Sequence, residues 1–83
     1  MSRPWFRART LAALGTAVAE IRRAAGLTQT DAADVAGSSR PTISRMERGQ
    51  PVTSSLLIAM LEGTGYEVVI VPRGARVIVQ DPA

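Results

Sequence analysis

Four short segments each open with a hydroxyl residue and end at glycine, and this spacing limits most of the chain to short helices. Hydroxyl side chains cap helix N-termini, and glycine readily adopts the left-handed conformation that ends a helix. Within the segments, apolar residues recur every three or four positions. We therefore expect four or five helices over residues 10–65, one of them from Gln29 to Ala36. The capping residues are Thr10, Thr28, Ser38 or Ser39, and Thr53 or Ser54, and the stops are Gly26, Gly37, Gly49, and Gly63 with Gly65.

The pattern changes after Gly65 to two β-branched runs, residues 66–71 and 75–80, separated by Pro72, Arg73 and Gly74. Proline at the second and glycine at the fourth turn position fit a type I turn with a glycine bulge, so we predict a β-hairpin. Both of its faces carry apolar residues, and a two-stranded ribbon is marginal alone. We expect it to form an intersubunit sheet through Tyr66, Val68, Val69, Ile70, Val71, Val77, Ile78 and Val79.

The chain has 83 residues, the size of one small domain with a limited core, so oligomerisation is a natural source of added stability. We divide it into a basic N-terminal arm over residues 1–9, a helical domain over residues 10–65 and a C-terminal dimerisation element over residues 66–83. Trp5 and Phe6 of the arm are expected to dock on the hairpin or on a partner subunit.

Composition narrows the possible functions. All ten basic residues are Arg and the net charge is +3, which suits a phosphate-bearing partner, although a GC-rich genome accounts for Arg over Lys equally well. Cysteine and histidine are absent and the acids are scattered, so we expect no enzyme, no metal site and no cofactor. Without a membrane-spanning or signal-peptide segment, we expect a cytoplasmic protein with no membrane partner.

Two short helices joined by residues 37–39 have the helix-turn-helix arrangement, whose second helix enters the major groove of DNA. Small residues at Ala32, Ala33 and Ala36 allow the helices to cross closely. Ile43 and Met46 lie three positions apart and anchor the second helix inward. The outward face then holds hydroxyls and guanidinium groups suited to phosphates and base edges, from Ser39, Arg40, Thr42, Ser44, Arg45 and Arg48.

Residues 27–49, LTQTDAADVAGSSRPTISRMERG, resemble the signature of the Xre/Cro/C1 helix-turn-helix family. The resemblance implies a mainly α, lambda-repressor-like domain of four or five helices. It also implies a transcriptional repressor that binds double-stranded DNA as a homodimer on a palindromic operator.

The family's pattern implies a role for each matching residue. Gln29 would contact a phosphate and brace Arg40, while Ser39, Arg40 and Thr42 would open the recognition helix closest to DNA. Arg45 would reach bases or the far strand, and Arg48 would bind phosphate.

Arg40 is expected to recognise guanine, because a bidentate hydrogen-bonded contact between arginine and guanine favours guanine over other bases by about 1–3 kcal/mol. Pro41 restricts Arg40 to extended backbone angles and offers only apolar contact to a thymine methyl. Glu47 is implied to pair with Arg22. The alternative is that it accepts a hydrogen bond from a cytosine amine.

The strand-rich C-terminus after a helix-turn-helix also resembles antitoxins of the HipB type, with a β lid that dimerises the protein. This implies an antitoxin that represses its own operon. The alternative is a protein-interaction module whose main role is to bind and neutralise a toxin. For the arm, residues Arg3, Arg7 and Arg9 either reach a DNA groove or belong to a disordered tail.

Overall fold

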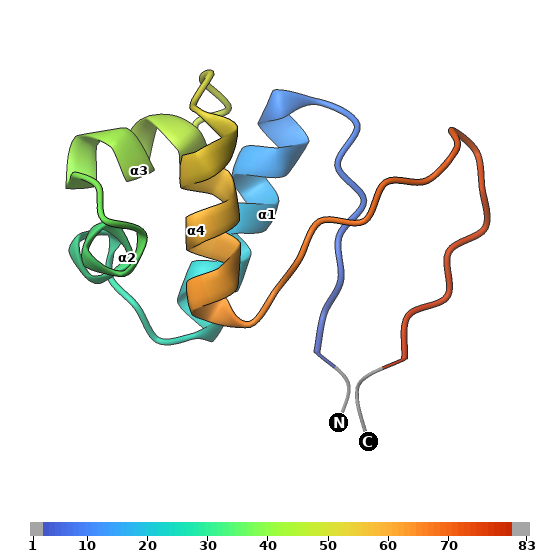
Figure 1. The fold of residues 1–83 in the computed structure, drawn as a ribbon, viewed down its shortest axis with the longest axis horizontal. Helices are drawn as coiled ribbons and strands as arrows, with labels where there is room; N and C mark the ends of the chain where they lie inside the picture. The colour runs from blue at the N-terminus through green and yellow to red at the C-terminus, as the bar shows by residue number, and fades with distance from the viewer. Residues whose placement is uncertain (1–2, 81–83) are drawn as a thin grey trace.

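The computed structural model describes residues 3–80 and contains four α-helices over that range. They are α1 (Leu11–Ala24), α2 (Gln29–Ala36), α3 (Arg40–Glu47) and α4 (Ser54–Thr64). Figure 1 shows α4 crossing in front of α1, with α2 and α3 to one side and the two terminal segments to the other. The predicted mainly α domain is confirmed, with four helices. Residues 1–2 of the predicted arm and 81–83 of the predicted dimerisation element lie outside the described residues.

Hydroxyl side chains cap all four helices at the positions that the sequence indicates. Thr28 and Asp31 form a reciprocal capping box, in which each side chain accepts the other residue's backbone N–H at 3.0 Å. This satisfies donors that have no partner within a helix. At the other helices, the side chain accepts from the third residue onward, at N–O distances of 3.0, 3.4 and 3.2 Å for Thr10, Ser39 and Thr53.

Two glycines inside helices allow close packing rather than ending a helix. A Cβ at Gly15 of α1 would lie 2.6 Å from the carbonyl oxygen of Met46 in α3. Gly63 was predicted to help end the fourth helix, but it lies within α4, which ends instead at Gly65 with φ of 79°. A Cβ at Gly63 would overlap the Cγ1 atom of Val35, so this glycine lets α2 approach α4.

The core lies among the four helices, and Val18, Ile43 and Met60 are its largest fully buried side chains. Ala32 and Ala33 of α2 are also buried against it, so the predicted close crossing of α2 and α3 is confirmed. Burial of each large apolar side chain stabilises the fold by about 1.5–3 kcal/mol. The inward-facing Ile43 and Met46 therefore hold α3 in a definite orientation on this core.

The C-terminal segment differs from the predicted hairpin. Among residues 66–80 no strand forms, and no backbone hydrogen bond joins residues 66–71 to residues 75–80. The turn is shifted by one residue, because Ala75 N donates to Pro72 O at 3.1 Å and places Gly74 third, with φ of 81°. That position of a type II turn requires positive φ. The predicted intrachain hairpin is therefore not formed, and the segment consists of two extended limbs, residues 66–71 and 75–80.

The N-terminal arm accounts for the separation of these limbs, because it lies along the C-terminal segment (Figure 1). Arg3 donates to the carbonyl oxygen of Gly65, and the Tyr66 hydroxyl donates to that of Pro4, at 3.0 and 2.8 Å. Arg7 donates to the carbonyl oxygen of Ala75 at 3.1 Å. The arm thus contacts both ends of the 66–75 stretch through side chains, without forming a sheet.

No helix among residues 3–80 has the length and hydropathy to span a membrane.

Candidate nucleic-acid interface

The turn between α2 and α3 sets the angle at which α3 leaves the core. Gly37 has φ of 64°, a left-handed conformation that costs glycine little. Its N–H donates to Asp34 O at 3.2 Å, and Ser38 N donates to Ala33 O at 2.8 Å. These two bonds form a Schellman motif, which ends α2 and reverses the chain within three residues.

One side of α3 is committed to the core and the opposite side is open to solvent. Ile43 is fully buried and Met46 is only 2% exposed, so these residues define the inward side. The predicted contact residues divide by exposure: Thr42 and Ser44 are half-buried, while the exposed ones are Ser39, Arg40, Pro41, Arg45 and Arg48. The structure therefore brings the predicted residues of α3 onto one outward surface, which we call the α3 face.

Hydroxyl groups on the α3 face hold two of its three arginines. Arg45 donates from Nη2 to the Oγ1 atom of Thr42 at 3.1 Å, and this hydroxyl lies 2.9 Å from that of Ser39. One turn later, Arg48 Nη1 donates to the Oγ atom of Ser44. The Arg40 side chain, by contrast, makes no hydrogen bond or ion pair with the residues that the structure describes. Arg45 and Arg48 are thus partly ordered before any ligand arrives.

Glu47 is turned away from the α3 face and into a polar network between three helices. It accepts from Arg22 of α1 at both carboxylate oxygens, with N–O distances of 2.6 and 3.1 Å. Arg22 is 9% exposed and also donates to the carbonyl oxygen of Leu27. Burial acts to raise the pKa of Glu47, but hydrogen bonds from Arg22 and Gln29 and the Arg22 charge hold it below the usual value. This leaves no free carboxylate on the α3 face.

Gln29, the first residue of α2, joins this network through its amide nitrogen, which donates to Glu47 at 3.1 Å. The predicted contact between Gln29 and Arg40 is not present among residues 3–80. Gln29 is instead half-buried against α3, a position that follows from the crossing of α2 and α3 and has no separate sequence signal.

The start of α4 also belongs to this surface, although no sequence pattern indicated it. An open groove of about 500 Å³ runs between the α2–α3 turn, α3 and the loop leading into α4. Thr42 and Arg45 line one side of the groove, while Thr53 and Ser55 line the other, with their hydroxyls 3.2 Å apart. Hydroxyls, guanidinium groups and a helix N-terminus are the groups that proteins use on phosphates and base edges.

A helix-turn-helix family model matches residues 18–71, nearly two thirds of the chain. The chain belongs to the helix-turn-helix family. The identification from residues 27–49 as an Xre/Cro/C1-type helix-turn-helix is confirmed, and with it the class of DNA-binding proteins that regulate transcription. Among the predicted elements, α2 and α3 are the two helices of the motif.

Solved structures resemble this helix-turn-helix chain over most of its length. The clp gene regulator ClgR from C. glutamicum is 32% identical, with a TM-score of 0.66 over 70% of this chain and 76% of that one. A mutant of the restriction-modification controller protein C.Esp1396I is 25% identical, with a TM-score of 0.65 over 75% and 80% of the two chains. No curated protein sequence matches significantly.

The residues predicted for dimerisation lie outside the helix-turn-helix core. Tyr66 and Val77 are half-buried, whereas the other six side chains are exposed. Ile70 is the extreme case, at 93% of its full accessible area. Within one chain these apolar side chains therefore have little to pack against, and the exposed ones are Val68, Val69, Ile70, Val71, Ile78 and Val79.

Proposed function

We propose that the protein is a sequence-specific transcriptional repressor that inserts α3 into the major groove of its operator. The observation that carries this proposal is the α3 face, which presents three guanidinium groups and three hydroxyls with its one carboxylate withdrawn to Arg22. Such a surface attracts DNA phosphates and also carries the donors that distinguish guanine in the major groove.

Some residues of the α3 face contact base edges and determine sequence specificity, whereas others contact phosphates and position the helix. Arg40 and Arg45 contact base edges, with Thr42 and Ser39 beside them and Pro41 against a thymine methyl. Ser44 orders Arg48, which binds phosphate at the end of the helix, and Gln29 contacts phosphate at the start of α2. Phosphate contacts set the register of α3 on the duplex, but they carry no sequence information.

We further propose that the regulator acts as a homodimer on a palindromic site, joined through residues 66–79 in an intersubunit sheet. The exposed β-branched side chains of this segment support the proposal, since large apolar groups that remain exposed in a monomer commonly mark an interface. Half-sites about 34 Å apart, one helical turn, would then place both recognition helices on one face of the duplex. The similarity of the chain to the gene regulator ClgR and to the controller protein C.Esp1396I also supports a role in gene control.

An antitoxin role is the more specific form of this proposal, in which the protein represses its own operon and also binds a toxin. The alternative is a module whose main role is to neutralise that toxin. A toxin gene beside this one, and a toxin that co-purifies with an Arg45→Ala variant unable to bind DNA, would favour the alternative. A toxin-free neighbourhood would leave a stand-alone or phage regulator.

Binding to DNA from the protein's own promoter, measured by fluorescence anisotropy against random DNA, tests the proposal. We expect Arg40→Ala to lower discrimination, and Arg48→Ala to weaken all sequences alike and to reduce the salt slope by about one. Arg23→Ala, an equal charge loss on α1, is the matched control. Equal affinity for promoter and random DNA would contradict sequence-specific regulation.

A further inference from the structure

A second groove lies where α4 meets the beginning of the C-terminal segment. It is open, has a volume of about 430 Å³, and is lined by Ile58, Leu61, Glu62, Tyr66, Glu67 and Val68. Most of its lining is apolar, yet two carboxylates lie on it. Neither the Glu62 nor the Glu67 carboxylate has a hydrogen bond or ion pair with another of residues 3–80. The groove is therefore both apolar and negatively charged, in a chain with a net positive charge.

The limb over residues 75–80 has the opposite character. Ile78 is 76% exposed and Val79 is 48% exposed. Keeping such apolar side chains in water is unfavourable in free energy. Arg73 lies in the turn just before the limb and Arg76 near the start of the limb, and both are exposed. Neither arginine pairs with any group in the described part of the chain. The turn and the limb thus offer guanidinium groups followed by apolar side chains, which complement the carboxylates and the apolar lining of the groove.

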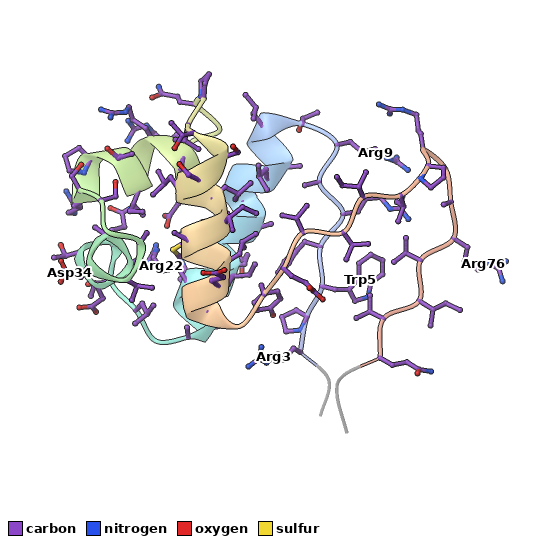
Figure 2. All side chains as sticks on the ribbon, viewed as in Figure 1. Arg3, Trp5, Arg9, Arg22, Asp34 and Arg76 are labelled. Atoms are coloured by element: carbon purple, nitrogen blue, oxygen red, sulfur yellow. The ribbon has the colours of Figure 1, made fainter. Side chains whose placement is uncertain are left out.

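Groove and limb of one chain are kept apart in the structure. The turn closed by Pro72 and Ala75 redirects the chain, and Arg7 of the arm holds the Ala75 carbonyl. Figure 1 shows residues 75–80 on the far side of the arm from α4, and Figure 2 shows Arg76 directed away from the helices. The arm also bonds to Gly65 and Tyr66, which steadies one end of the groove. The limb of one chain therefore lies away from its own groove (Figure 1).

We infer that the groove binds the 75–80 limb of a second copy of this chain, with Arg73 and Arg76 of each copy facing Glu62 and Glu67 of the other. The inference rests on the proposed dimer and specifies its contact. Because each copy offers one groove and one limb, a two-fold axis forms two identical contacts and closes the assembly as a dimer. Apolar contacts supply most of the affinity, and the charges select register and partner.

Charge reversal in the full-length protein tests this contact by sedimentation, at a concentration where the wild type is dimeric. The groove variant is Glu62→Arg with Glu67→Arg, and the limb variant is Arg73→Glu with Arg76→Glu. Each alone places like charges together and is expected to raise the dimer dissociation constant about tenfold or more. Mixed in equal amounts, the two variants restore opposite charges at both contacts and are expected to form a heterodimer. One chain carrying all four changes is expected to form a homodimer again.

The control reverses an exposed pair elsewhere, as Glu20→Arg with Arg23→Glu on α1, and is expected to dimerise like the wild type. Unchanged helical circular dichroism in all variants excludes misfolding as the cause. Groove and limb variants that both dimerise normally, or a mixture that stays monomeric, would overturn the inference. A monomeric wild type would also overturn it and would leave the groove to another protein. Binding to a DNA half-site, measured separately, tests the α3 face independently of these outcomes.

Discussion

The Arg22 guanidinium and the Glu47 carboxylate meet in parallel, with Nε 2.6 Å from one carboxylate oxygen and Nη2 3.1 Å from the other. The pair joins α1 to α3, and Arg22 also reaches the Leu27 carbonyl beyond the end of α1. Both side chains are largely buried, with 11% and 7% of their areas exposed. Through this contact, α1 fixes the end of α3 and removes a negative charge from the α3 face.

Loss of Arg22 is expected to destabilise the fold strongly. Arg22→Ala leaves the Glu47 carboxylate buried without its charged partner, which costs about 3 kcal/mol or more of the free energy of unfolding. Urea denaturation followed by circular dichroism measures this loss. Arg23→Ala breaks only the exposed pair with Glu20, 3.5 Å apart, and is expected to cost less than about 1 kcal/mol. Similar losses for both variants would contradict a special role for the buried pair.

Stability is expected to fall in acid because of the same carboxylate. The pKa of folded Glu47 lies below its ordinary value of 4.5, so the unfolded chain binds a proton more readily than the folded one. The stabilisation is complete well above pH 4.5 and is lost as pH falls through the folded pKa. Glu47→Gln is expected to flatten this part of the curve of unfolding free energy against pH. Glu20→Gln, on the surface, is the control, and an equal flattening there would contradict the assignment.

Gly63→Ala is expected to destabilise the fold, although alanine normally favours helix over glycine by about 1 kcal/mol. The new methyl group would overlap Val35 of α2, and such overpacking costs about 1–3 kcal/mol. Because Val35 is 44% exposed, Gly63→Ala combined with Val35→Ala is expected to recover most of the loss in thermal or urea unfolding. Gly15→Ala meets backbone atoms of α3 instead, so no such rescue exists for it. Failure of the double variant to recover would show that Val35 is not the obstacle.

Thr42→Val is expected to weaken operator binding by about two- to tenfold, the range for ordering one long side chain. The substitution keeps the shape but removes the hydroxyl that holds Arg45 and contacts Ser39. In a double-mutant cycle, Thr42→Val should have little further effect once Arg45→Ala is present. Thr16→Val serves as control, because that hydroxyl bonds only to Ala12 of its own helix. Additive effects in the cycle would show that Thr42 and Arg45 act separately.

Local features made most of the helical domain predictable. Caps such as Thr28 act within one turn of the chain, and the spacing of Ile43 and Met46 defines an inward side wherever the helix packs. The helix-turn-helix and the outward set of arginines and hydroxyls follow from these short-range rules. Gly63 was misread because a helix-ending glycine and a packing glycine look alike until the facing helix is known.

The sequence by itself determined where the four helices begin, which side of α3 turns inward, and which side chains remain on the α3 face. Tertiary structure alone decided the position of Gln29 on Glu47, the groove between α3 and the start of α4, and the course of the chain after Gly65. Each of these depends on groups far apart in the sequence, such as Arg7 and Ala75, which compete with the local strand propensity of the C-terminal segment. Residues with high strand propensity form a sheet only when a partner strand is available. Within one chain, the arm keeps residues 66–71 and residues 75–80 apart.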